Sequence, residues 1–205
     1  MAVPCPRCRR EYDVTLFEFG RTLWCTCGSR VGLAPRERRH TRSERRFIAD
    51  AMLGRLARWL RLLGFDCAWE PDISDQVLVR RAIAEGRIVL SRDRALPEEW
   101  RISGIHQVDA KKVRDQLSEV VSAFDLAPEI RLLSRCSHCN APLAPAAFRD
   151  VVERVPQRVL ERHDVFSTCP ACSRVYWEGT HTARIKRFVD ELVARLEAAT
   201  PGPPS

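Results

Sequence analysis

The stretch FIADAMLGRLARWLRLLGFD, residues 47–66, decides the fold of this chain. Its first three residues form an apolar run that predicts a short strand ending at Asp50. The leucines that follow recur at helical spacing, and Gly64 is a typical stop for the helix expected over 52–63. A second strand is expected over 65–69, so the stretch predicts a strand, a helix and a strand in succession.

The same alternation continues for another sixty residues or so. A helix is expected over 76–85, a strand over 87–90, a short strand near 106–108 and a helix over 112–124. Strands that alternate with helices connect through right-handed crossovers and pair in parallel. The sequence therefore predicts an α/β fold with a parallel sheet and helices on both of its faces.

Acidic residues follow the predicted strands. Asp50, Asp93 and Asp109 stand at strand ends, and Asp75 heads the second helix. The carboxyl ends of parallel strands meet at one edge of the sheet, so we expect these four residues, here called the acidic rim, to gather there. Clustered carboxylates repel each other, and a hard cation such as Mg²⁺ or Mn²⁺ relieves that repulsion.

Each of these acids also has a structural interpretation. Asp75 occupies an expected helix N-cap, Asp50 could cap the first helix, Asp93 lies in a turn, and Asp109 could start the next helix. No single position decides between the two interpretations. The prediction of a metal site depends on the four acids as a set.

Arginines accompany the rim. Arg55, Arg58 and Arg61 recur every three residues on the first helix, and Arg92 and Arg94 flank Asp93 on the chain. The helical arginines fit either a solvated face or a track that contacts phosphates. From these positions, Arg55, Arg58, Arg92 and Arg94 are candidate contacts to a phosphate-containing substrate.

Two cysteine doublets lie near the C-terminus, in CSHC and CPAC. Two such knuckles supply the four thiolates that a tetrahedral Zn²⁺ takes, and the roughly thirty residues between them suit a zinc ribbon. A four-sulfur site is closed to substrate, so the zinc is structural. The predicted ligands are Cys136, Cys139, Cys169 and Cys172.

A second set of cysteines lies near the N-terminus, where the closing pair has a single residue between its members. A hairpin across Gly20, over 12–23, is expected between the two pairs. So short a module needs the metal to fold, and the chain is therefore expected to bind one or two Zn²⁺. The predicted ligands of this set are Cys5, Cys8, Cys25 and Cys27.

Composition limits the class of protein. The chain has 205 residues, of which 45% are hydrophobic and 30% charged, as expected for a globular protein. Its net charge is +7, and two Zn²⁺ sites of four thiolates each would lower it to about +3, so global charge is weak evidence for nucleic-acid binding. We find no apolar run long enough to span a membrane and no export signal, and cysteines in doublets favour metal binding over disulfides. A cytoplasmic location is expected.

These features divide the chain into six predicted segments. An amphipathic helix is expected near the C-terminus, with an apolar stripe suited to packing on the preceding domain. The segments are an N-terminal zinc ribbon (1–34), a basic linker (35–46), an α/β domain (47–134), a C-terminal zinc ribbon (135–183), the amphipathic helix (184–199) and a disordered tail (200–205).

Four motifs in this order resemble one protein family. They are FIADAMLGRLARWLRLLGFD, ISDQVLVRRAIAEGRIVLSRD, RCSHCNAPL and FSTCPACSRVYWEGTH. Together they resemble the PIN-like ribonuclease domain with a C-terminal zinc ribbon, a family named after the C-terminal region of a mutator exonuclease. The resemblance covers roughly 47–185, and the N-terminal ribbon lies outside it.

The resemblance implies a PIN-like α/β/α sandwich that cleaves RNA phosphodiester bonds with a metal ion. Asp50, Asp75 and Asp93 would hold the Mg²⁺ or Mn²⁺, with Asp109 as a fourth catalytic member. Members of the family often have threonine where this chain has Ser91, which keeps the hydroxyl group.

Two other functions stay open at this stage. The chain could be a nucleic-acid-binding adapter without activity, although a surface that only binds phosphates gains nothing from clustered carboxylates. It could also cleave DNA, because the sequence does not distinguish a substrate with a 2′-hydroxyl from one without it. The expected partner is RNA, with DNA possible and no membrane, and the oligomeric state is left open.

Overall fold

The structure is a computed structural model that describes residues 1–34 and 45–199. Most of the predicted basic linker and the predicted tail lie outside the described residues. The contacts divide the chain into two units, which are described separately below. The first contains residues 1–57 and 67–109, and the second contains 58–66 and the chain from 110 onward.

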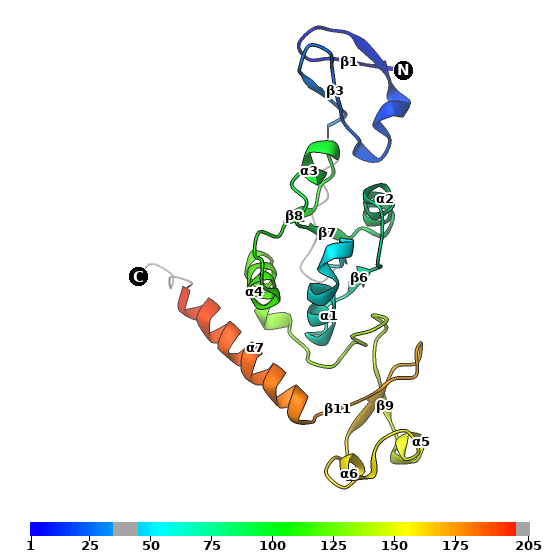
Figure 1. The fold of residues 1–205 in the computed structure, drawn as a ribbon, viewed down its shortest axis with the longest axis vertical. Coiled ribbons are helices and arrows are strands. Elements are labelled where there is room, and N and C mark those ends of the chain that lie inside the picture. The colour runs from blue at the N-terminus through cyan, green and yellow to red at the C-terminus, as the bar shows by residue number, and fades with distance from the viewer. Residues whose placement is uncertain (35–44, 200–205) are drawn as a thin grey trace. The chain divides into compact units, whose positions relative to one another are not determined.

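A four-stranded parallel sheet forms the centre of the first unit (Figure 1). Its strand order is β6-β5-β7-β8, so that β6 lies on one side of β5 and β7 on the other. The sheet is flanked by helices, which confirms the predicted α/β class. The strands are β5 (Phe47–Ala49), β6 (Cys67–Trp69), β7 (Ile88–Ser91) and β8 (Ile105–Gln107).

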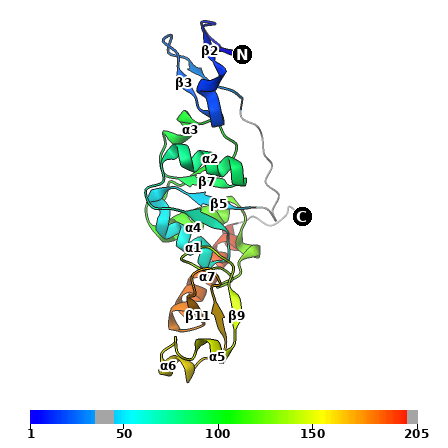
Figure 2. The ribbon, with the colours of Figure 1, turned by 90° about the vertical axis from the view of Figure 1, so that its right-hand side faces the viewer.

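The strands pair in a register that aligns their carboxyl ends. Ala49 stands opposite Leu90 and Trp69, and Ser91 stands opposite Gln107. The amide of Asp50 donates to the carbonyl of Leu90 at 3.0 Å, which extends the pairing by one residue. Strands β5 and β7 are neighbours in the sheet (Figure 2). The chain therefore leaves both strands at the same level of the sheet.

Helix α2 (Asp75–Glu85) packs on the sheet through its apolar face. Leu78, Val79 and Ala82 are buried against strand residues such as Ile48 and Val89. Burial of a whole aliphatic side chain contributes about 1.5–3 kcal/mol, so this face holds the helix in place. The N-terminus of α2 thereby acquires a fixed position relative to the strand ends.

The predicted helix over 52–63 begins with a short 3₁₀ segment, Ala51–Leu53 (η3), and continues as α1 (Gly54–Leu62). Gly64 follows it with φ at +99°, the left-handed backbone that favours glycine. A Cβ on Gly64 would lie 2.5 Å from the carbonyl oxygen of Arg131, so no other residue fits this position without a shift. The predicted helix stop is confirmed.

The N-terminal ribbon consists of two small hairpins joined by a 3₁₀ helix, Val14–Gly20 (η1). The predicted hairpin across Gly20 is wrong, because each hairpin instead encloses one of the two cysteine pairs. Asp13 starts the intervening helix, and its carboxylate accepts from the amide of Thr15 at 2.9 Å. The paired strands are β1 (Ala2–Pro4) with β2 (Glu11–Asp13), and β3 (Leu23–Trp24) with β4 (Arg30–Val31).

The N-terminal ribbon is bonded to the segment that follows β7 in the same unit. The amide of Thr22 donates to the carbonyl of Glu99 at 2.7 Å, and the amide of Arg101 donates to the carbonyl of Gly20 at 2.7 Å. A Cβ on Gly20 would lie 2.6 Å from the carbonyl oxygen of Arg101, so the contact requires glycine there. The ribbon thus pairs edge to edge with residues that begin at the short helix α3 (Leu96–Glu99).

The second unit contains the C-terminal ribbon together with two longer helices and a short 3₁₀ helix. Its ribbon sheet is antiparallel with the order β11-β10-β9, and two short helices are inserted between β9 and β10. The elements are α4 (Val113–Ala123), η4 (Ala127–Glu129), β9 (Ala144–Ala146), α5 (Phe148–Val151), α6 (Gln157–Leu160), β10 (Phe166–Thr168), β11 (Val175–Trp177) and α7 (Thr180–Ala199).

Helix α7 uses its apolar stripe inside this unit. The ring of Phe188 meets the ring of Trp59 edge-on at 5.4 Å between centroids, and the guanidinium of Arg114 lies 4.8 Å from the same Phe188 ring. None of the described helices has the length and apolarity needed to cross a membrane.

Candidate active site and metal centres

The acidic residues that follow β5 and β7 lie at the point where the strand order reverses. The chain moves from β5 to β6 on one side and reaches β7 on the other side of β5. Ligands of open α/β sheets bind beyond the carboxyl ends of the strands at such a switch point. Asp50 follows β5 directly, and Asp93 comes two residues after β7. Topology thus gives these two acids the position where a ligand is expected.

A serine hydroxyl connects the two strand ends. Ser91 Oγ donates to Asp50 Oδ2 at 2.6 Å and accepts from the amide of Asp93 at 2.9 Å. Ser91 is buried and Asp50 is only 6% exposed. The hydroxyl therefore fixes the Asp50 carboxylate and the backbone of Asp93 with respect to each other.

Asp75 is the first residue of α2, and Ser74, rather than Asp75, is the N-cap. The Asp75 carboxylate makes no hydrogen bond or ion pair with any residue that the structure describes, so capping does not account for it. Burial, followed by the negative charges of Asp50, Asp93 and Glu99, raises the pKa of Asp75 above its ordinary value. This acid lies near other acids and forms no ion pair with a basic side chain of the described residues.

The structural interpretations of the other rim residues have different outcomes. Asp50 makes no side-chain capping bond to the 3₁₀ helix that follows it. Asp93 Oδ1 accepts from the amide of Ala95 at 2.8 Å, which is a turn contact as expected for an aspartate in that position. Asp109 does not start a helix, because α4 begins at Val113, and it pairs with Arg94 at 3.4 Å.

Glu99 is a further acid near the rim that the sequence analysis missed. It lies on α3 and contributes to the raised pKa of Asp75. It does not follow a strand, so a search limited to strand ends does not find it. Its position depends on the turn after Asp93, where Pro97 sits in the first turn of α3 and favours a new helix.

The candidate arginine contacts are exposed. Arg55 and Arg58 lie on the solvent face of α1, and Arg92 and Arg94 lie on the turn after β7. Arg61 is different, because it is only 3% exposed. Its Nη1 donates to the carbonyl of His138 at 2.6 Å, within the second unit. Neither a solvated face nor a phosphate track describes Arg61, and both interpretations were wrong for this residue.

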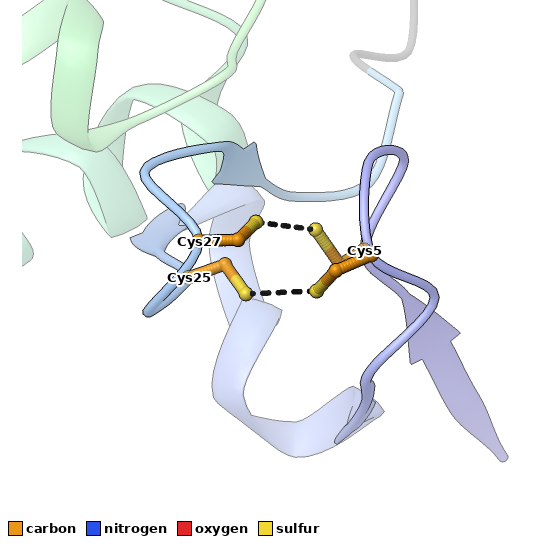
Figure 3. A group of neighbouring side chains, drawn as sticks. Cys5, Cys25 and Cys27 are labelled. Carbon is orange, nitrogen blue, oxygen red and sulfur yellow. Dashed lines mark hydrogen bonds between the residues drawn. The ribbon is translucent and has the colours of Figure 1, made fainter.

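The eight paired cysteines form two clusters, as the sequence predicts. In the N-terminal cluster the Sγ atoms of Cys5 and Cys27 are 3.6 Å apart, and Figure 3 shows them facing each other across the two hairpins. The Sγ atoms of Cys8 and Cys25 are 3.4 Å apart. The single-residue spacing is accommodated by a turn in which the amide of Gly28 donates to the carbonyl of Cys25.

The C-terminal cluster has the same dimensions. Cys136 and Cys172 approach to 3.5 Å between sulfurs, and Cys139 and Cys169 to 3.3 Å. Sulfurs bound to one tetrahedral Zn²⁺ at about 2.3 Å lie about 3.8 Å apart, whereas a disulfide requires about 2.05 Å. Both clusters therefore fit Zn²⁺ and exclude disulfides.

Hydrogen bonds assist ionisation of thiols in both clusters. In the N-terminal cluster, the amide of Cys27 and the hydroxyl of Tyr12 lower the pKa of Cys25 to about 6. In the C-terminal cluster, burial opposes ionisation of Cys136, but the amide of Cys139 and the Tyr176 hydroxyl, 3.1 Å from the sulfur, outweigh it and lower the pKa to about 6. Hydrogen bonds of this kind to the ligating atoms orient zinc ligands and tune their basicity.

The acidic rim differs from the clusters in spacing. Among the described residues, the groups of three or more candidate ligands that approach within 4.8 Å of one another are the two cysteine clusters. The rim carboxylates are more open than that. Mg²⁺ is commonly bound through one or two carboxylates and several waters, so an open arrangement suits it, and the unpaired charge of Asp75 suits a cation.

One comparison with known proteins identifies the family. Residues 45–189 match the family model described as the Mut7-C RNAse domain. No curated protein and no solved structure matches the chain. The match spans the sheet, the acidic rim and the C-terminal cluster, and it supports a nuclease-type function with a nucleic-acid substrate. It also confirms the resemblance stated from the sequence motifs: this chain belongs to the Mut7-C RNAse domain family.

Proposed function

We propose that this protein is a metal-dependent ribonuclease whose Asp50, Asp75 and Asp93 hold a Mg²⁺ or Mn²⁺ ion. The observation that carries the proposal is the convergence of acids from three separate segments at the switch point of the sheet, with Asp75 lacking any hydrogen-bond or ion-pair partner among the described residues. A carboxylate with a raised pKa among other carboxylates is typical of functional sites.

The donor set suits a hard cation and phosphodiester chemistry. Carboxylate oxygens are the ligands that Mg²⁺ and Mn²⁺ prefer. When bound, such an ion supplies an activated water and charge stabilisation for phosphoryl transfer. No cysteine is required in this proposal, because the four-thiolate sites are closed to substrate.

The remaining residues of the site have positioning and binding roles in this proposal. Ser91 keeps the Asp50 carboxylate in one orientation through its 2.6 Å hydrogen bond. Arg92 and Arg94, exposed on the turn that carries Asp93, contact the phosphates on either side of the scissile bond. Arg55 and Arg58 extend this contact along α1, and Asp109 completes the rim while paired with Arg94.

The two ribbons stabilise their units and assist RNA binding in this proposal. Each cluster carries four cysteines at zinc spacing, and a structural zinc supplies folding energy directly. Thiolate sites of this kind need a reducing environment, so we place the protein in the cytoplasm.

The test is cleavage of a labelled single-stranded RNA by the full-length protein, with and without Mn²⁺. Wild type is expected to produce fragments with 5′-phosphate ends, and the single variants Asp50→Asn and Asp93→Asn are expected to lose this activity by orders of magnitude. Glu11→Gln, an exposed acid of the N-terminal ribbon, is the matched control and should cleave like wild type.

The outcomes separate the alternatives. Turnover by Asp50→Asn equal to that of wild type would remove the catalytic assignment. Binding of RNA without cleavage in any divalent metal would indicate an adapter. A parallel assay on DNA of the same sequence decides whether the 2′-hydroxyl matters.

A further inference from the structure

Trp24 is a large aromatic side chain on the surface of the N-terminal ribbon. It is 67% exposed, although tryptophan is one of the side chains that gain most from burial. It lies on β3, and the neighbouring Leu23 packs into the small core of the ribbon while Trp24 faces the other way. The ribbon core therefore does not explain why a tryptophan occupies this position.

The backbone that carries Trp24 is held on both sides. Cys25, the next residue, belongs to the N-terminal cluster, with its sulfur 3.4 Å from that of Cys8. Across the hairpin Trp24 stands opposite Arg30, whose Nη2 donates to the carbonyl of Pro97 at 2.7 Å. The backbone that carries the indole therefore needs little ordering when a ligand stacks on the ring.

Arginines accompany Trp24 at the cysteine knuckles. Arg7, Arg9 and Arg10 are exposed, and none of them forms an ion pair with a residue in the described part of the chain. Arg7 Nη1 donates to the carbonyl of Cys27 at 3.0 Å, which holds Arg7 beside the turn that follows β3. Arg9 follows Cys8 just as Trp24 precedes Cys25, so both residues adjoin the same pair of facing sulfurs.

The strand with Trp24 is also joined to α3, the helix that carries Glu99. Two residues before Trp24, Thr22 donates its amide to the carbonyl of Glu99, and its hydroxyl to the carbonyl of Glu98 at 2.6 Å. Glu99 is close enough to Asp75 to raise its pKa. The ribbon strand is therefore bonded directly to the helix that carries Glu99.

We infer that the N-terminal ribbon is a binding site for single-stranded nucleic acid, in which a base stacks on Trp24 and Arg7, Arg9 and Arg10 contact the phosphates. An aromatic platform beside exposed cations is the combination that sequence-tolerant single-strand binders use. The exposed arginines of the ribbon favour a polyanion as the occupant over a protein partner. The inference deepens the proposed function, since it names how the same substrate is held outside the acidic rim.

The experiment measures binding apart from cleavage. Full-length protein with Asp50→Asn and its Zn²⁺ is titrated into a fluorescein-labelled single-stranded RNA without added Mg²⁺ or Mn²⁺, and fluorescence polarisation gives the affinity. Adding Trp24→Ala is expected to weaken binding about tenfold, while Trp24→Phe keeps most of the affinity because it retains an aromatic face. Leu16→Ala, on the same ribbon and 49% exposed, is the matched control and should leave the affinity unchanged.

The salt dependence of the affinity distinguishes the contribution of base stacking from that of phosphate contacts. The ratio of affinities between the parent protein and Trp24→Ala should persist as salt is raised, because stacking releases no counterions. Arg9→Ala should instead reduce the slope of log affinity against log salt by about one. Zinc content and circular dichroism of each variant show that the ribbon is still folded.

Two results would overturn the inference. One is equal affinity of the parent protein and Trp24→Ala, and the other is absence of single-strand binding by the parent protein. Either result can accompany normal RNA cleavage by wild type, in which case only the inference fails. Binding that depends on Trp24, without cleavage by wild type, would leave the inference standing and remove the proposed ribonuclease.

Discussion

The cysteine clusters and the acidic rim arrange their charged side chains in two different ways. In each cluster the ligands come from two tight turns, and the facing sulfurs lie 3.3–3.6 Å apart. In the rim the acids come from strand ends and a helix start, and their oxygens are more widely spaced than those of the clusters. The first arrangement closes around an ion, and the second leaves room for water and substrate.

This difference separates folding from chemistry. A closed zinc site contributes to the stability of a small unit, whereas an open carboxylate site costs stability until a cation arrives. In the rim, the sheet and the Ser91 hydroxyl hold the Asp50 carboxylate and the backbone of Asp93 in place. Removing a cluster cysteine should therefore damage folding, and removing a rim acid should damage activity without loss of folding.

The largest expected effect is on folding of the second unit. Cys136→Ser should unfold the C-terminal ribbon, because zinc binding in comparable peptides contributes about 10–16 kcal/mol, as much as the whole stability of a domain. Metal analysis should fall from two Zn²⁺ to one, and hydrogen exchange over β9–β11 should become rapid. Slow exchange in that region of the variant would contradict the structural role of zinc.

A smaller loss of stability is expected when Arg61, the buried cation that contacts the turn of the C-terminal cluster, is replaced. Arg61 is buried and donates to the carbonyl of His138, so Arg61→Met leaves that carbonyl without its donor and should cost about 2 kcal/mol of unfolding free energy. Arg58→Met, on the exposed face of the same helix, is the control and should change the stability little. Chemical denaturation of both variants measures the difference, and equal stabilities would refute the role given to Arg61.

Substitution of Ser91 tests whether activity depends on the orientation of the Asp50 carboxylate. Ser91→Ala removes the hydroxyl that holds Asp50, and RNA turnover should fall about tenfold, since a hydrogen bond to a charged group contributes about 1.5–3 kcal/mol. Ser91→Thr keeps the hydroxyl and should retain most of the activity. If the alanine and threonine variants turn over RNA equally, the hydroxyl has no positioning role.

The smallest effect concerns pH. Because the pKa of Asp75 is raised in the folded state, the unfolded chain loses this proton first, and stability falls as pH rises from about 4 through the raised pKa. Mn²⁺ should restore that stability, so the melting temperature should rise by a few degrees with Mn²⁺ above this range and less below it. Asp75→Asn should show a much weaker response to both pH and Mn²⁺, and an unchanged response would argue against ion binding at Asp75.

Sequence patterns predicted the sheet and the clusters because both depend on local signals. The apolar run before Asp50 and the leucines of α1 identify elements by periodicity alone, and cysteine doublets identify metal knuckles by spacing. The hairpin across Gly20 was wrong because the least exposed residues of 14–20 recur at every third position, as in a 3₁₀ helix, and not at every second position as in a strand. Gly20 is instead bonded to Arg101, which is far away in sequence.

The missed parts of the candidate site depend on contacts distant in sequence. Arg61 looked like its exposed neighbours Arg55 and Arg58, since the surface that buries it comes from residues near His138. Glu99 follows no strand and approaches Asp75 only through the turn after β7. Such residues are found by tertiary structure rather than by pattern.

The most direct test of the central claim is Mn²⁺ binding, followed by electron paramagnetic resonance on protein with both zinc sites filled. Wild type is expected to bind Mn²⁺ in addition to its Zn²⁺, and Asp50→Asn and Asp93→Asn are expected to lose the Mn²⁺ while keeping the Zn²⁺. If these variants bind Mn²⁺ as tightly as wild type, the acidic rim is not the site of the ion and the account is contradicted.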